Sequence, residues 1–199
     1  MNDFLEWTQG VELGRGLQAD VSAFLQAHHR TRTLAHDQQV AAEASRLALR
    51  FGADGVKAEQ AGWLHDISAV IPNNRRLEAA RRWGLAVLPE EEAFPMLIHQ
   101  QLSGVMAREI FGVQDEEVLS AVTCHTTLRH AASKLDLVLF VADKIAWDQP
   151  GNPPYLEALN AALEQSLAQA ARVYLEYLRE HLTGPLHPWA RAALFDLLD

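Results

Sequence analysis

The chain has 199 residues, 49% of them hydrophobic, which fits one domain with a substantial buried core and excludes intrinsic disorder. The 17 Lys and Arg residues against 26 Asp and Glu residues give a formal net charge of −9, which disfavours binding to nucleic acids. A signal-peptide pattern and a bilayer-spanning apolar run are both absent from the sequence, and the single Cys124 excludes an intrachain disulfide framework, so we expect a cytoplasmic protein without membrane contacts.

The first part of the chain is predicted to be helical. Residues 1 to about 27 have the pattern of one or two amphipathic helical segments, interrupted at Gly14 and Gly16. The next helix is predicted from His36 to Phe51, with Gly52 as its natural end, because apolar residues recur there at spacings of four, three and four. These apolar residues are Val40, Ala44, Leu47 and Phe51.

A second predicted helix leads to a histidine that is directly followed by an aspartate. Asp54 is a suitable cap for this helix, which ends in an apolar run before His65 and Asp66. A short basic helix capped by Asn73 or Asn74 should follow and end at Gly84. Its arginines are expected to form a solvated face; they are Arg75, Arg76, Arg81 and Arg82. Beyond it, a linker rich in glutamate is expected between Pro89 and Pro95.

Three further helices are predicted to carry polar residues of the same kinds. The first spans Leu97 to Phe111 and holds His99 in its first turn. The second runs from Glu116 to Cys124 after the cap Asp115, and it places His125 at its end. The third begins at the capping-box pattern of Ser133 and Asp136 and is strongly apolar around Asp143.

The pattern of the remaining residues predicts helices that pack against other parts of the protein, and it contains no candidate catalytic group. Residues 148–154 have the composition of a loop. From Leu156 to Leu178 leucines recur on one helical stripe, which predicts an internal packing face or the face of a homodimer. A terminal helix is expected from about Trp189, and because no segment has a long alternating β pattern, the predicted fold is all-α.

Four histidines and two aspartates lie inside or at the ends of these apolar helices. They are His36, His65, Asp66, His99, His125 and Asp143. Neutral imidazoles and carboxylates bind divalent first-row metals, and a carboxylate with two oxygens can bridge two of them. Two neighbouring metals can hold a phosphoryl group and acidify water. Cys124, although adjacent to His125, is better interpreted as a small buried thiol than as a nucleophile.

The order and surroundings of these six residues resemble the HD-domain metal-dependent phosphohydrolases, and among them the YqeK family. The resemblance covers residues 30–180, and its most diagnostic motif is His125-Thr126-Thr127 with Arg129 two residues further on. The other motifs are His36-x-x-x-Val40-Ala41, Leu64-His65-Asp66-Ile67, His99 with the nearby Gly104, and Ala142-Asp143-Lys144-Ile145.

The resemblance implies an HD-domain helical bundle over residues 1–199, with a core at about 30–180, an N-terminal helical extension and a C-terminal helical tail. It implies one metal on His36, His65, Asp66 and Asp143, and a second metal on His99 and His125 with Asp66 as the bridge. Iron is the expected metal, and Mn, Co, Ni or Zn are alternatives because ligands of this type accept several metals.

The implied activity is symmetric hydrolysis of diadenosine tetraphosphate to two ADP, with a small nucleotide as the partner. Asp66 and Arg129 are the expected catalytic residues, with Arg129 on the phosphates, where a guanidinium fits well. The remaining expected substrate contacts are Thr126, Thr127, Arg75 and Lys144. Two alternatives stay open: another HD-domain nucleotide hydrolase, such as a nucleotidase or a cyclic-nucleotide phosphodiesterase, and a non-catalytic HD module for signalling.

The chain also departs from the pattern of this family. A lysine often follows the His-Asp pair there, but Ala69 and Val70 occupy this place, and Leu128 stands where a glycine commonly follows His-Thr-Thr. The six candidate ligands are unaffected by these departures. Arg75 or Arg76 is a candidate replacement for the missing positive charge.

Overall fold

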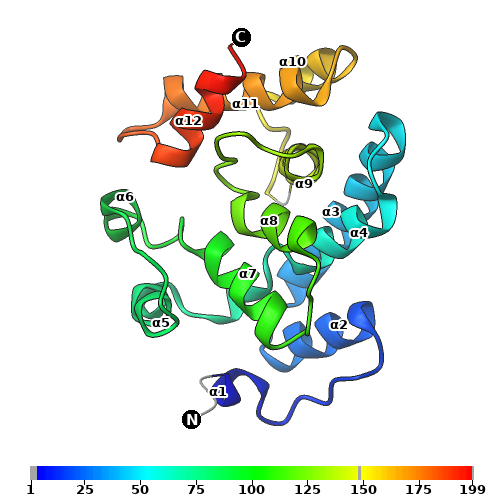
Figure 1. The fold of residues 1–199 in the computed structure, drawn as a ribbon, viewed down its shortest axis with the longest axis vertical. Coiled ribbons are helices and arrows are strands. Elements are labelled where there is room, and N and C mark those ends of the chain that lie inside the picture. The colour runs from blue at the N-terminus through cyan, green and yellow to red at the C-terminus, as the bar shows by residue number, and fades with distance from the viewer. Residues whose placement is uncertain (1–3, 148, 199) are drawn as a thin grey trace.

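A computed structural model describes residues 4–147 and 149–198, and this part of the chain is helical and contains no strand. Figure 1 shows the helices as a layered bundle, with α1 and α12 at opposite ends of the molecule. The helices are α1 (Leu5–Thr8), α2 (Leu17–Ala27), α3 (Thr31–Phe51), α4 (Gly55–Leu64), α5 (Arg76–Arg82), α6 (Pro89–Ala93), α7 (His99–Glu109), α8 (Glu116–Cys124), α9 (Lys134–Ile145), α10 (Leu156–Leu163), α11 (Leu167–His181) and α12 (Pro188–Asp196), with the short 3₁₀ helices η1 (Ile67–Val70) and η2 (Asn73–Arg75).

The long helix α3 packs against both α4 and α9. The contact with α4 is very close at Gly62, where an added Cβ would lie 2.4 Å from the Cα atom of Ala41. Only glycine fits at this distance, because real Cβ atoms need more than 3 Å from a neighbouring backbone. The close approach brings the end of α4, which precedes His65, against α3, and the imidazoles of His65 and His36 come into contact.

Helices α7 and α8 complete the core and pack against each other, while α8 also contacts α4 and α9. The predicted helix starts are confirmed here. The Asp115 carboxylate accepts from the backbone N–H groups of Glu117 and Val118, and Ser133 with Asp136 forms a capping box at the start of α9. These local hydrogen bonds fix where the two helices begin, and thereby the positions of His125 and Asp143.

Several predicted boundaries were wrong. Helix α3 begins at Thr31 rather than His36, which places His36 inside the helix. The expected linker after Pro89 contains the short helix α6, because proline is well suited to the first position of a helix and the Glu91 carboxylate accepts from the N–H of Leu88. No side-chain hydrogen bond caps α5, although Asn73 and Asn74 precede it.

The C-terminal helices cover one end of the core. The leucine stripe is divided between α10 and α11, and Leu159, Leu163 and Leu167 are buried within the chain, which confirms the internal packing face. Helix α11 packs against α9 and α12. Of the predicted loop at 148–154, Asp148 lies outside the described residues. In the described part of the chain, no helix has the length and apolarity required to cross a membrane.

Candidate metal centre

The six predicted ligands come from five different helices or their ends. His36 lies in α3, His65 and Asp66 follow α4, His99 begins α7, His125 follows α8 and Asp143 lies in α9. Their side chains converge in the interior, where the imidazole of His65 contacts those of His36 and His125 with ring centroids 5.1 and 4.9 Å apart. The predicted convergence of these residues is therefore present in the structure.

The first group of side chains is formed by His36, His65 and Asp143. The Nε2 atom of His36 lies 3.1 Å from Oδ1 of Asp143, and Nε2 of His65 lies 3.8 Å from the same oxygen. One donor atom from each residue lies within 4.8 Å of the other two. This spacing allows the three atoms to surround a single cation.

The second group surrounds Asp66. Its Oδ1 atom lies 3.2 Å from Nε2 of His99 and 3.6 Å from Nε2 of His125, whereas its Oδ2 atom lies 3.9 Å from Nε2 of His65. The two carboxylate oxygens therefore face different histidines. A bridging carboxylate between two cations requires this arrangement.

Three of the histidines have the same tautomer, which their backbone hydrogen bonds determine. The Nδ1 atoms of His65, His99 and His125 bond the carbonyl oxygens of Gly62, Met96 and Val122, each three residues earlier in the chain. Because a carbonyl only accepts, each Nδ1 carries the proton and each Nε2 presents a lone pair to the centre. The buried Nε2 of His65 has no hydrogen-bond partner among the described residues. These features fit metal-binding histidines.

The protonation states also suit metal binding. Burial lowers the pKa of His65 to about 4, so its imidazole is neutral at physiological pH. Burial alone would raise the pKa of Asp66, but the neighbouring imidazoles of His65, His125 and His99 outweigh this effect and hold that pKa well below its usual range. For Asp143, the adjacent Lys144 and the hydrogen bond from His36 likewise overcome the effect of burial.

Asp37 is a buried acid beside the centre that the sequence analysis did not identify. Its carboxylate is fully buried, lies 3.5 Å from Nδ1 of His65 and has no hydrogen-bond partner among the described residues. Burial, with the nearby carboxylates of Asp66 and Asp143, raises the pKa of Asp37 well above its usual range. Its position behind His65 is that of an outer-shell group.

Lys144 and the two threonines lie next to the ligands. The Lys144 ammonium binds the Asp143 carboxylate and the carbonyl oxygen of His125, so it neutralises a candidate ligand from a buried position. The hydroxyl of Thr126 lies 3.1 Å from Nε2 of His99. Gln100, which the sequence analysis missed, accepts from the backbone N–H groups of Thr126 and Thr127 and so orders this turn.

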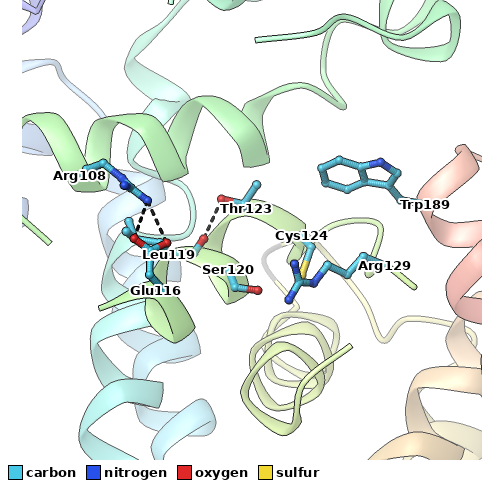
Figure 2. Close-up of a pocket in the computed structure, with 8 residues that line it drawn as sticks. All are labelled: Arg108, Glu116, Leu119, Ser120, Thr123, Cys124, Arg129 and Trp189. Atoms are coloured by element: carbon cyan, nitrogen blue, oxygen red, sulfur yellow. Dashed lines mark hydrogen bonds and ion pairs between the residues drawn. The ribbon is translucent and has the colours of Figure 1, made fainter. Parts of the chain in front are cut away.

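The guanidinium of Arg129, for which the family resemblance implies a contact with phosphate, pairs with a carboxylate of the chain in the structure. Its Nε donates to the buried Asp136 carboxylate at 3.0 Å. Figure 2 shows Arg129 beside Cys124 in a pocket of about 480 Å³ that Trp189 also lines, and none of the six candidate ligands lines this pocket. Asp136 precedes Asp143 by two turns of α9, which accounts for the separation of Arg129 from the centre.

The two arginines at the start of α5 lie in different surroundings. Arg75 binds Glu6 and lies over the ring of Trp7, at the contact with α1. Arg76, expected on a solvated face, is buried, and its guanidinium contacts the carbonyl of Ile71 and the sulfur of Met96. Burial lowers the pKa of Arg76, and the charge of Asp66 opposes this shift, so its charge acts on the centre.

A family model described as the HD domain matches residues 33–148, and the chain belongs to the HD-domain family. This range holds all six candidate ligands. The family implies binding of a divalent metal ion, and the two groups of histidines and aspartates fit such an ion.

The chain is similar to two known proteins in sequence and to one solved structure in fold. The chain is 45% identical over 137 residues to the "uncharacterized protein in pepC 5′ region" of Lactococcus lactis subsp. cremoris, covering 69% of this chain and 70% of that protein. It is 31% identical to the symmetrical bis(5′-nucleosyl)-tetraphosphatase of Bacillus subtilis, covering 72% and 77%. A predicted HD superfamily hydrolase involved in NAD metabolism from Clostridium acetobutylicum shares the fold, with a TM-score of 0.84, 24% identity and coverage of 93% and 98%.

Proposed function

We propose that the chain is a metal-dependent phosphohydrolase that cleaves dinucleoside tetraphosphates, such as diadenosine tetraphosphate, symmetrically into two nucleoside diphosphates. One observation carries the proposal: the two oxygens of Asp66 face two different groups of histidines, which suits a pair of metals. The Bacillus subtilis relative, a symmetrical bis(5′-nucleosyl)-tetraphosphatase, supports this substrate.

In this proposal His36, His65 and Asp143 would hold one metal and His99 and His125 the other, and both metals would share Asp66 as a ligand. When bound, the two metals act as Lewis acids that polarise the phosphoryl group and lower the pKa of water. Iron is the proposed metal, and Mn, Co, Ni or Zn would also be accepted by a site of nitrogen and oxygen ligands.

The residues of the chain prepare this chemistry in three ways. Hydrogen bonds to backbone carbonyls hold the imidazoles of His65, His99 and His125 in the tautomer that binds metal. Lys144 offsets the negative charge of Asp143. The low pKa of Asp66 keeps its carboxylate ionised at neutral pH, so that both oxygens are available as ligands.

Arg76 is the proposed anchor for the phosphate chain, in place of Arg129. A guanidinium close to the centre would bind phosphate oxygens with charge-assisted hydrogen bonds and so determine which phosphorus is attacked. Arg76 is buried, and its charge acts on Asp66, whereas Arg129 is committed to Asp136.

We therefore expect Arg76→Lys to lower kcat/KM by about tenfold or more, in line with the 1.5–3 kcal/mol of a charged hydrogen bond. The neighbouring Arg75→Lys is the matched control, because Arg75 binds Glu6 and Trp7 instead. Arg129→Lys should also retain activity. Equal losses in the Arg75 and Arg76 variants would show that Arg76 has no special role in catalysis.

The proposed function is tested by supplying the protein anaerobically with Fe²⁺, Mn²⁺ or Co²⁺ and following diadenosine tetraphosphate by chromatography. Two ADP per substrate are expected, and ATP with AMP would refute symmetric cleavage. Turnover of mononucleotides or cyclic nucleotides without turnover of the tetraphosphate would favour another HD-domain hydrolase. Failure to turn over any of these with any metal would favour a non-catalytic module.

A further inference from the structure

An apolar cavity of about 340 Å³ lies beside the candidate metal centre. Its walls come from the segment before α7, from the end of α11 and from the segment that leads into α12. Most of the side chains that line it are apolar, and among them are Phe94, Met96, Tyr174, Leu178, Leu182 and Leu186. Phe94, Met96 and Leu182 are exposed, with 53%, 58% and 41% of their surfaces accessible. Large apolar residues gathered in this way at the surface of a cavity are typical of a ligand site.

Three residues of the cavity wall connect it to the metal centre and to the cations beside it. Thr126 lines the cavity, and its hydroxyl lies 3.1 Å from Nε2 of His99. Met96 lines it too, and its carbonyl accepts from Nδ1 of His99, while its sulfur contacts Arg76. Tyr174 in the cavity wall lies 5.2 Å from the ammonium of Lys144. Single wall residues therefore separate a molecule in the cavity from the guanidinium of Arg76, through Met96, and from the candidate ligand His99, through Thr126.

We propose that this cavity binds one nucleoside of the substrate, an inference that rests on the proposed function. Aromatic and aliphatic side chains suit the faces of a nucleobase, and the cation beside the cavity suits the phosphates attached to it. The volume is near the lower end of the roughly 300–1,000 Å³ of sites for small molecules, so it fits one nucleoside and not two.

The inference assigns a role to the C-terminal tail. Residues 174–190 supply more than half of the cavity lining, and all of them lie beyond the region 33–148 that the HD-domain family model matches. The family region would then hold the metals, while the tail would recognise the nucleoside. His187 is a buried polar residue in this wall: its Nδ1 accepts from the N–H of Trp189, and its Nε2 lies 3.6 Å from Oε1 of the buried Glu91.

The test compares two double variants of the metal-loaded protein. Phe94→Ser with Leu182→Ser removes two exposed side chains from the cavity. The matched control, Phe195→Ser with Leu49→Ser, removes two exposed side chains of the same types that do not line it. Binding of adenosine alone is measured by saturation-transfer NMR, and kcat/KM is measured with diadenosine tetraphosphate.

The cavity variant is expected to lose most of the adenosine signal and to lower kcat/KM at least tenfold, mainly through KM. The control should match the wild type. Equal adenosine binding in the two double variants, or absence of adenosine binding to the wild type, would overturn the inference. Adenosine has no phosphate to hydrolyse, so its binding is independent of catalysis. If only the cavity variant loses adenosine binding, the inference is supported even when the wild type does not cleave the tetraphosphate. Failure to cleave would then count against the proposed function alone.

Discussion

Single residues determine whether the centre accepts a cation, and the geometry of the histidines is already set by the backbone. His65, His99 and His125 each follow the carbonyl that accepts their Nδ1 proton by three residues. Each of these histidines lies at the end of a helix. Backbone carbonyl groups there are not all used by the helix, so they can accept a hydrogen bond from an imidazole. Their Nε2 atoms consequently point inward without the help of distant side chains.

The buried Asp37 should make the free energy of unfolding of the metal-free protein depend on pH. Its raised pKa means that the folded state holds the proton more tightly than the unfolded chain, whose value is about 3.8. The stability that it contributes is thus fully present below this value and is lost as the pH rises through the folded-state pKa.

We expect Asp37→Asn to become more stable relative to the wild type as the pH rises, by at most about 1.4 kcal/mol per pH unit. Urea unfolding of chelated protein at several pH values between 4 and 8 measures this difference. A stability difference that stays constant over the range would contradict the raised pKa of Asp37.

The sequence identified the six side chains that converge at the candidate centre but not the partners of the arginines. Histidines and aspartates inside apolar helices are conspicuous, because a buried polar group needs a compensating interaction. Arg129 looked suitable because it follows His125 by four residues. Its actual partner Asp136 had been assigned only to a capping box, and one carboxylate oxygen serves both that cap and the arginine.

Among the contacts between helices, that of α3 with α4 requires a glycine, at position 62. We expect Gly62→Ala to destabilise the protein by about 2–3 kcal/mol, since the new methyl group would overlap the backbone of Ala41. It should also weaken metal binding, because Gly62 supplies the carbonyl that orients His65.

Gly55→Ala in the same helix is the matched control. An added Cβ there would meet only side chains, at 3.4 Å or more, so a neutral or slightly stabilising effect is expected. Denaturant unfolding of the two variants gives the comparison. The account of the α3–α4 contact fails if both alanine variants have the same stability.

Leu128 has both a strained backbone conformation and a side chain that packs in the core. Its φ is +58°, in the left-handed region where glycine is favoured, and its side chain is fully buried. This conformation suits glycine, the residue that the family resemblance leads us to expect after His-Thr-Thr. Leu128→Ala and Leu128→Gly both lose the buried side chain, at about 2–4 kcal/mol, but only alanine keeps the strain of about 1 kcal/mol.

We therefore expect Leu128→Gly to be at least as stable as Leu128→Ala in thermal or denaturant unfolding. At an ordinary position alanine is more stable than glycine by about 0.5–1 kcal/mol. Recovery of that usual order would show that the left-handed conformation of Leu128 carries little strain.

Helix starts with local signals were predicted well, whereas the burial of side chains that depends on tertiary contacts was not. Asp115 and the Ser133–Asp136 box mark helix starts through hydrogen bonds to residues two or three positions away, which the sequence displays directly. The buried face of α5 depends on Arg76 meeting Ile71 and Met96, and the latter is twenty residues distant. The basic composition of α5 predicted only a solvated surface.

For the whole molecule, the centre draws on α3, α4, α7, α8 and α9, all within or bordering the match to the HD-domain family. The C-terminal helices pack on α9 and add the wall of the apolar cavity. The arrangement separates the proposed metal chemistry from nucleoside recognition. It also makes Asp66, which lies between both groups of histidines, the residue on which the whole proposal depends most.

The most direct measurement is the metal content of anaerobically reconstituted wild type and Asp66→Ala, determined by elemental mass spectrometry. We predict two metal ions per chain in the wild type. The variant should lose at least one of them, together with nearly all turnover, and its helical circular dichroism should be retained because most of the core is apolar. Equal metal content and near wild-type turnover in Asp66→Ala would contradict the bridging role of this carboxylate.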